Sequence, residues 1–260
     1  NIILPVGVSF YTFQTLSYTI DVYRKNILPT RDFISFSAFV SFFPQLVAGP
    51  IEKARNLLPQ ISSKRTPTKK QLSEGLILIV TGLFRKVMIG DVSGRYVDNI
   101  LNDMAFYHSS ELIFAMFLFS IQIYCDFSGY SKMARGCAKL LGFELSINFS
   151  QPYLASNITD FWRRWHISLS SWLKEYLYFS LGGNKKGAKR TKINLIITML
   201  LGGLWHGAGA NFIIWGGLHG LFLSIHKLYS KRYLKPYSNP NLLVKIFKVI
   251  TTSLPPEAAA

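Results

Sequence analysis

The sequence places histidines in a long run that carries no other ionisable side chain. Residues Ile193–His226 contain no Lys, Arg, Asp or Glu. The run holds His206 in a Trp-His-Gly triplet and His219 in a Leu-His-Gly triplet, and a second Trp-His pair ends upstream at His166. An ionisable residue at membrane depth is costly and marks a functional site by default. The pattern therefore indicates a membrane enzyme.

A neutral imidazole is suited to acyl transfer. It can act as a general base near pH 7, and an apolar surround favours its neutral form. Such a base can accept the proton of a hydroxyl whose oxygen attacks an acyl carbonyl, without a separate serine or cysteine nucleophile. Glycines on both sides of His206 would allow a ligand to approach the backbone closely. The alternative for each histidine is a structural hydrogen bond between helices.

The remaining histidines favour structural roles. His219 follows Trp215 by four residues among glycines, which predicts a packing residue, and His108 and His226 lie in polar or interfacial contexts. The sequence has no HxH, HxxxH or HExxH spacing, so we expect no metal site. Cys125 and Cys137 form no CxxC motif and are interpreted as buried structural thiols.

The charge distribution favours a membrane partner over nucleic acid. Lys and Arg number 29 against 13 Asp and Glu, for a net charge of +16. The basic residues lie in short stretches between apolar runs, as in cytoplasmic loops that face anionic lipid. Because they form no continuous basic face, we expect no nucleic-acid binding. The positive-inside rule places both basic loops, Glu52–Lys70 and Gly182–Lys192, on the cytoplasmic side.

The apolar and amphipathic segments predict an all-α fold, a polytopic transmembrane core with kinked, re-entrant and interfacial helices. The sequence shows no internal repeat and no soluble domain, so residues 1–260 are interpreted as one membrane unit. We expect this unit to be a fragment of a longer chain. Its motifs lie within residues 4–226, and residues 227–260 are interpreted as a basic interfacial tail. The expected apolar segments are Ile2–Ile20, Phe33–Ile51, Leu72–Gly90 and Leu112–Cys125, and the expected interfacial helices are Ser131–Leu141 and Asp160–Leu181.

The run that contains His206 is too long for one span. A straight helix over it would reach about 50 Å, against a hydrocarbon core of about 30 Å. We expect two half-spans broken at Gly202-Gly203 and at Gly207–Gly209, with His206 on irregular backbone that lines a cavity. The alternative is one tilted span followed by an interfacial segment. Asp126, at the end of another apolar run, either pairs with Arg163 or Arg164 or caps the following helix.

Four segments together resemble the membrane-bound O-acyltransferase family, in its bacterial alginate O-acetyltransferase-like branch. The segments are Leu4–Arg24, Phe42–Glu52, Tyr124–Ser131 with Asn148–Trp172, and Gly202–Gly220. The resemblance covers most of the chain up to His226. It implies a multi-pass enzyme of the cell membrane, in contact with membrane lipid.

The resemblance also implies a set of site residues. His206 matches the family's histidine in the Trp-His-Gly motif, and His166 matches the second functional histidine of the bacterial branch. Around these catalytic residues we expect Trp165 and Trp205 to wall the site. The expected polar residues that bind substrate are Asp126, Asn157, Asp160 and Arg163.

The reaction that the resemblance implies is O-acylation of a cell-surface polysaccharide. The acyl group, acetyl by expectation, would come from a cytoplasmic thioester donor such as acetyl-CoA, with no tightly bound cofactor. An extracytoplasmic partner protein, acyltransferase-like or esterase-like, would carry it toward the polysaccharide acceptor. D-alanyl transfer to teichoic acid is one alternative. A polytopic transporter and a non-catalytic membrane scaffold are the others.

Overall fold

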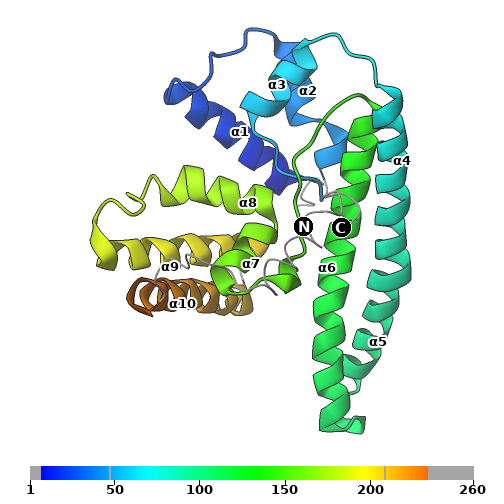
Figure 1. The fold of residues 1–260 in the computed structure, drawn as a ribbon, viewed down its shortest axis with the longest axis vertical. Coiled ribbons are helices and arrows are strands. Elements are labelled where there is room, and N and C mark those ends of the chain that lie inside the picture. Colours follow the sequence, from blue (N-terminus) through cyan, green and yellow to red (C-terminus); the bar gives the residue numbers. More distant parts are fainter. Residues whose placement is uncertain (1–6, 47, 208, 234–260) are drawn as a thin grey trace, which may run out of the picture. The chain divides into compact units, whose positions relative to one another are not determined.

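The computed structural model describes residues 7–46, 48–207 and 209–233. Over these residues the secondary structure is helical throughout and contains no strand, so the all-α prediction is confirmed for them. The chain divides into two compact units, Asn1–Asn148 and Phe149–Ala260, which are described separately (Figure 1). The expectation of one membrane core over 1–260 stays a prediction. The tail from residue 234 onward lies outside the described residues.

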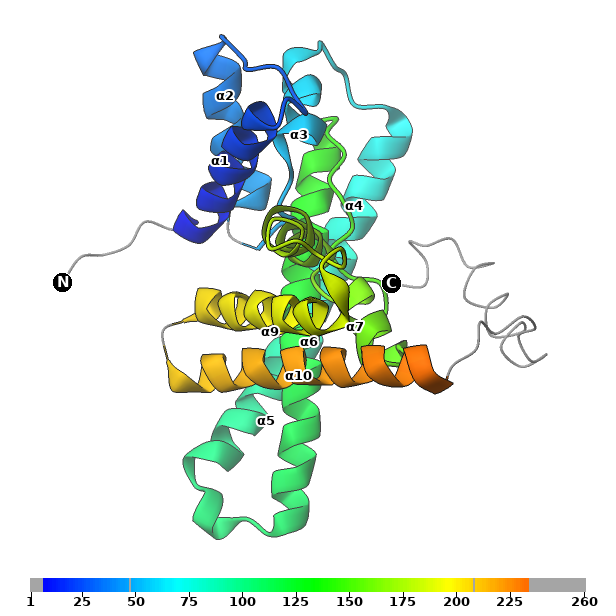
Figure 2. The same ribbon diagram turned by 90° about the vertical axis from the view of Figure 1, so that its left-hand side faces the viewer.

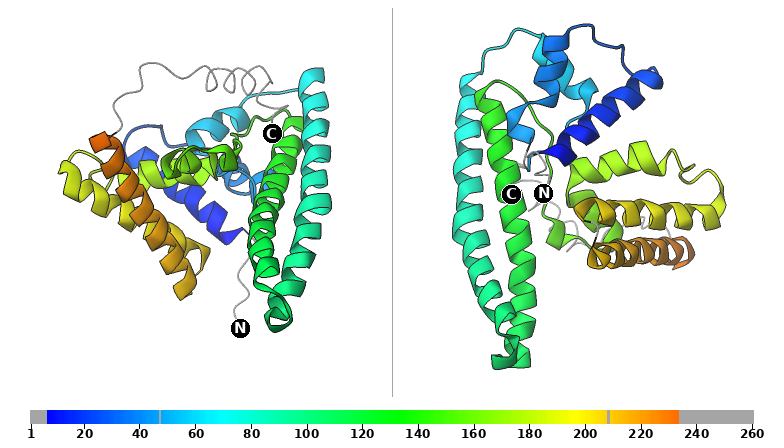
Figure 3. Two further views of the ribbon diagram at one scale, coloured as in Figure 1. Left: turned by 60° about the horizontal axis from the view of Figure 1, so that its bottom comes forward. Right: turned by 180° about the vertical axis from the view of Figure 1, so that it is seen from behind.

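The first unit is built around two long helical rods. The first rod joins α4 (Lys69–Phe84), the π-helix η2 (Arg85–Gly90) and α5 (Asp91–Asn102), and it runs antiparallel to α6 (Ser109–Leu140) in every view (Figure 1, Figure 3). The shorter elements are α1 (Val8–Tyr23), α2 (Phe33–Val40), η1 (Phe43–Gln45), α3 (Ala54–Ser62) and η3 (Met104–Phe106).

Helix α6 replaces two elements that the sequence predicted separately. The apolar run and the amphipathic segment after it form one helix of 32 residues, about 48 Å long. Among the residues described here, α6 is the one helix long and apolar enough to cross a membrane. The basic segment predicted as a loop is also partly helical, because α3 buries Leu57 in a core with Phe39 and Ala138.

Glycines let α4 approach α6 at backbone distance. A Cβ atom on Gly82 would lie 2.6 Å from the carbonyl oxygen of Gly129, and one on Gly136 would lie 2.6 Å from that of Gly75. No side chain fits at these two contacts. Small residues at helix crossings are typical of membrane helices, where close packing replaces the hydrophobic effect.

Asp126 has a partner that its sequence context did not reveal. It lies inside continuous α6, so the predicted helix cap is wrong. Its carboxylate forms an ion pair with Lys86 Nζ at 2.7 Å, and Lys86 also pairs with Asp91. Because Lys86 lies in the π-helix η2 and Asp126 in α6, this charge pair links the two rods near their midpoints.

The second unit consists of short helices packed on a helical hairpin. It contains η4 (Pro152–Leu154), α7 (Ile158–Arg164), α8 (Ile167–Trp172), the π-helix η5 (Leu173–Tyr178), α9 (Gly187–His206) and α10 (Ala210–Tyr233). Figure 2 shows α9 and α10 side by side. Contacts of Gly216 with Met199 and of Gly220 with Ile196 show that they run antiparallel.

The hairpin confirms one predicted break and not the other. The chain turns between His206 and Ala210, where Gly207–Gly209 predicted a break. Gly202 and Gly203 instead lie inside α9, and a Cβ on Gly203 would come within 2.3 Å of the Phe212 carbonyl oxygen. These glycines permit helix contact and do not interrupt the helix. With 20 and 24 residues, α9 and α10 are also longer than half-spans.

Candidate functional site

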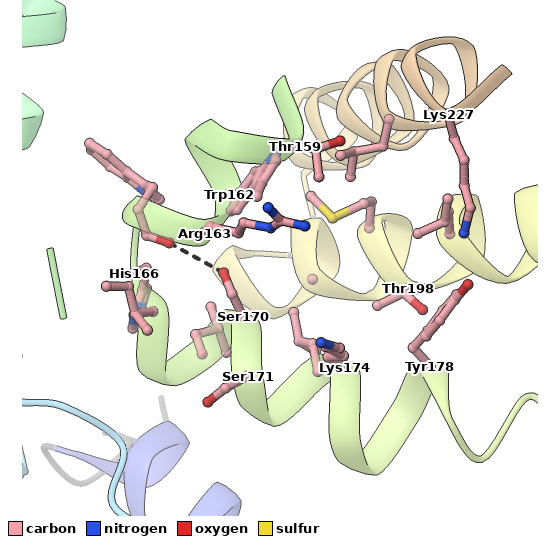
Figure 4. A pocket seen from close by; sticks show the side chains of 18 of the residues that line it. Thr159, Trp162, Arg163, His166, Ser170, Ser171, Lys174, Tyr178, Thr198 and Lys227 are labelled. Carbon is pink, nitrogen blue, oxygen red and sulfur yellow. Dashed lines mark hydrogen bonds between the residues drawn. The ribbon is translucent and has the colours of Figure 1, made fainter. Parts of the chain in front are cut away.

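The second unit contains a cavity of about 440 Å³ between α7, α8, η5 and the α9–α10 hairpin. Its volume lies in the range of small-molecule binding sites. Both motif histidines, His166 and His206, line it, as do Trp165 and Arg163. Figure 4 shows His166 at one end, Arg163 near the middle, and Tyr178, Thr198 and Lys227 toward the other end.

His166 occupies the junction between α7 and α8 in a conformation that few residues adopt. Its φ of 42° lies in the left-handed region, it is 2% exposed, and its carbonyl oxygen accepts the N–H of Ser170 at 2.9 Å. Such strain persists only where the surroundings impose it, and it clusters at functional sites. Burial, with a smaller contribution from His206, lowers the pKa of His166 to about 3. The imidazole is therefore neutral at physiological pH.

His206 ends α9 inside a cluster of aromatic rings. Its ring centroid lies 4.8 Å from that of Trp205, 5.5 Å from Trp215 and 6.2 Å from Phe212. Trp205 also lies 6.3 Å from the His166 ring, so this indole contacts both imidazoles. The side chain of His206 is exposed, whereas His166 is enclosed. One cavity thus presents an accessible imidazole and a buried one.

The expected polar residues of α7 separate into two groups. Asn157 caps the helix, its Oδ1 accepting the Asp160 N–H at 2.9 Å, and Asp160 pairs with Arg164 at 3.0 Å. Neither is among the residues that line the cavity. Arg163 and Trp165 do line it. Asp126 belongs to the other unit, where its carboxylate pairs with Lys86.

The third histidine of the apolar run lies behind the cavity wall. His219 Nδ1 accepts the indole N–H of Trp162 at 3.3 Å, and its ring packs against Trp215 at 4.7 Å. It does not line the cavity. A hydrogen bond of 2.8 Å joins Nδ1 of His226 and the hydroxyl of Thr159. These are the contacts that a packing histidine makes.

Several cavity residues were not anticipated from the sequence. Tyr178 and Lys227 lie at the end remote from His166, Lys174 lies between that end and His166, and Asn184 also lines the cavity. Lys227 Nζ donates to Asn184 Oδ1 at 2.8 Å, and the Tyr178 hydroxyl donates to the same oxygen. The sequence placed these residues in an interfacial helix, a basic loop and a tail. No local pattern signals that three such segments meet.

Comparison with known proteins finds relatives over most of this chain. The chain is 46% identical over 227 residues to the probable alginate O-acetylase AlgI of Pseudomonas fluorescens, covering 87% of this chain and 46% of that protein. It is 40% identical over 256 residues to the peptidoglycan O-acetyltransferase of Helicobacter pylori, covering 88% and 49%. It is 29% identical over 247 residues to the teichoic acid D-alanyltransferase of Bacillus subtilis, covering 89% and 61%.

The chain thus spans about half the length of the first two relatives. The sequence model of the membrane-bound O-acyltransferase family matches residues 24–256, a range that includes both Trp-His pairs and every helix that lines the cavity. This match covers most of the chain and includes the two histidines that line one cavity, and it shows that the chain belongs to the membrane-bound O-acyltransferase family.

Proposed function

We propose that the chain is the acyl-transferring core of a multi-pass cell-membrane O-acyltransferase. It moves an acyl group, acetyl in this proposal, from a cytoplasmic thioester donor toward hydroxyls of an extracytoplasmic polysaccharide. The observation that carries the proposal is the pair of imidazoles, His166 and His206, on one cavity. The proposed reaction is direct transfer from the thioester to the acceptor hydroxyl, with an imidazole as the base.

In the proposed step His206 is the general base. Its neutral imidazole nitrogen accepts the proton of the acceptor hydroxyl while that oxygen bonds to the thioester carbonyl carbon. The tetrahedral intermediate then collapses, the C–S bond breaks, and the leaving thiolate takes the proton back from the imidazolium. The products are an ester and a free thiol, so protons and electrons balance and no external oxidant or reductant is needed.

His166 has a different role, because it is buried and neutral. A neutral imidazole donates one hydrogen bond and accepts another. We assign His166 the positioning of substrate and of Trp205, whose ring centroid lies 6.3 Å from the His166 ring and 4.8 Å from the His206 ring. Trp165 lines the cavity and would wall the site, Trp205 would support the two imidazoles from outside the lining, and Arg163 would contact the donor. Asn157 and Asp160 would support it by shaping α7.

The relatives support the substrate class. Those at 40% identity and above are named for O-acetylation of alginate or peptidoglycan, both of which are glycans. We therefore propose a polysaccharide acceptor, reached through an extracytoplasmic partner protein. D-alanyl transfer to teichoic acid is the second candidate, supported by the relative at 29% identity.

The test is turnover by the full-length protein with His206→Ala, and with His219→Ala as the matched control. Acyl incorporation into polymer or partner protein is normalised to monodisperse detergent-extracted protein. We expect His206→Ala to lose about 10²–10⁴-fold in rate at normal yield, the range that a general base contributes. We expect His219→Ala to lower stability while turnover per folded molecule persists. Normal turnover by His206→Ala would remove the catalytic assignment and favour a transporter or scaffold.

A further inference from the structure

Helix α7 supplies one wall of the cavity although it is short and none of its residues is buried. It has seven residues, and three of them, Thr159, Trp162 and Arg163, line the cavity (Figure 4). His166 lies two residues after its end. A helix of this length is marginal by itself, so its position depends on contacts with neighbouring elements. The contacts of α7 therefore decide where these side chains stand in the cavity.

Two side-chain hydrogen bonds join α7 to α10. The indole N–H of Trp162 donates to Nδ1 of His219 at 3.3 Å. A distance of 2.8 Å separates the hydroxyl oxygen of Thr159 from Nδ1 of His226. Thr159 and Trp162 are three positions apart on α7, a spacing that puts them on one face of the helix. His219 and His226 are seven positions apart, about 10 Å along one face of α10. Because the two hydrogen bonds lie at different points along α10, together they fix both the position and the direction of α7.

The two hydrogen bonds are not equivalent. The Trp162 ring also packs against Trp215, with centroids 5.8 Å apart, so apolar packing remains at this point if the imidazole of His219 is lost. The Thr159 side chain, in contrast, makes no second hydrogen bond within the described ranges. Its hydrogen bond with His226 is therefore the polar contact that holds the first turn of α7 on α10.

A shift of this first turn would reach residues that the proposed reaction uses. Arg163 follows Thr159 by four positions, so the two lie on the same face of α7. At the other end of the helix, the Trp165 N–H donates to the Phe161 carbonyl oxygen at 2.8 Å, and the chain then turns at His166 with φ 42°. The left-handed conformation leaves His166 little freedom to compensate for a displaced helix. A displacement of about 1 Å at a reacting centre can lower a rate by about 10²-fold.

We propose that Thr159 and His226 are positioning residues for acyl transfer. Their hydrogen bond holds the first turn of α7 on α10, and the helix in turn places Arg163 and His166 in the cavity. The inference rests on the proposed function and adds two residues that the proposed reaction does not itself use. His226 does not line the cavity, so it contributes through Thr159 and not by contact with substrate.

Conservative substitutions separate the hydrogen bond from the shape of the cavity wall. Thr159→Val removes the hydroxyl and keeps a β-branched side chain, whereas Thr159→Ser keeps the hydroxyl. On α10, His226→Leu removes the imidazole, whereas His226→Asn places an amide near the position of Nδ1. Ser224→Ala is the matched control, because the Ser224 hydroxyl donates within α10 to the Gly220 carbonyl oxygen at 2.8 Å and Ser224 does not line the cavity.

The experiment measures turnover and local opening in the full-length protein. Acyl transfer from acetyl-CoA to polymer or partner protein gives kcat and donor KM per monodisperse molecule. Thermal unfolding gives Tm, and hydrogen exchange reports the local opening of α7.

We expect Thr159→Val and His226→Leu each to lower kcat about 10–100-fold and to leave donor KM nearly unchanged, the pattern of an interaction that acts in the transition state. The amides of α7 should exchange faster in both variants. Thr159→Ser and His226→Asn should retain most of the wild-type kcat, and Ser224→Ala should match wild type. The double variant Thr159→Val with His226→Leu should lose no more than the more impaired single variant, because both changes remove the same contact.

Several results would overturn the positioning role. One is an active wild type whose kcat is unchanged by Thr159→Val. Equal losses in Thr159→Val and Thr159→Ser would mean that the hydrogen bond is not what matters. Losses that multiply in the double variant would assign the two residues independent roles, and a loss of kcat shared by Ser224→Ala would indicate general destabilisation. Inactivity of wild type is distinct, because it would reject the proposed function itself.

Discussion

Replacing His166 with Asn should remove a specific part of the protein's sensitivity to acid. Asn tolerates the left-handed backbone that His166 adopts at φ 42°, so the substitution removes a titrating ring with little backbone strain. The folded protein holds this imidazole neutral, because burial lowers its pKa to about 3. The unfolded chain binds a proton there near the ordinary value of about 6.5.

The sign and size follow from linkage. Between pH 6.5 and 3 the unfolded state binds more protons at this position, so the stability of wild type falls as the pH falls through that window. A pH of 5 lies about 1.5 units below the pKa of the unfolded imidazole, so protonation of the unfolded chain at this position lowers the free energy of unfolding by about 2 kcal/mol. This figure depends on the unfolded pKa and hardly on the exact folded value. For a chain of this length, about 2 kcal/mol shifts Tm by roughly 4–8 °C.

The assay is thermal unfolding of detergent-extracted protein from pH 8 to pH 5. The Tm of wild type should fall by several degrees more than the Tm of His166→Asn over this interval. The two curves of Tm against pH should therefore converge as the pH falls. His108→Asn, at the exposed start of α6, serves as the control and should follow the wild-type profile. Parallel curves for wild type and His166→Asn would refute the reasoning, because they would mean that the folded protein also binds a proton at His166.

Three further predictions concern the first unit and the topology. Lys86→Met should lower the free energy of unfolding by about 1–2 kcal/mol, less than the loss of a fully buried pair, because Asp126 is 42% exposed. The control Lys70→Met removes a pair whose lysine is 84% exposed, and it should change the free energy of unfolding by under about 1 kcal/mol. Equal Tm losses of the two variants in thermal unfolding would contradict the assignment. Gly136→Ala should cost about 1–3 kcal/mol, because its Cβ would meet the Gly75 carbonyl oxygen at 2.6 Å, whereas Gly217→Ala meets only Leu200 Cδ2 at 3.5 Å and should leave Tm nearly unchanged. Cysteines at Ser63 and Lys189 should resist an impermeant thiol reagent added outside intact cells, and labelling of either would reject the cytoplasmic placement of both loops.

The sequence alone determined the features that depend on local pattern. The apolar and amphipathic segments predicted an all-α fold, and every secondary-structure element in the described residues is a helix. The glycines after His206 predicted the turn between α9 and α10, and at that turn a Cβ on Gly207 would lie 2.6 Å from Cε2 of Phe212. The two Trp-His pairs identified the histidines that line the cavity by residue type alone.

The tertiary structure decided whatever depends on a distant partner. Asp126 had the features of a helix end, but Lys86 on a neighbouring rod neutralises it and the helix continues. Gly203 was expected to break a helix and instead admits the backbone of Phe212. Lys174 and Lys227 are 53 positions apart, and only the packing of η5 against the hairpin brings them to one cavity. Local patterns record the preferences of a segment, whereas ion pairs, close contacts and cavities are properties of two segments that meet.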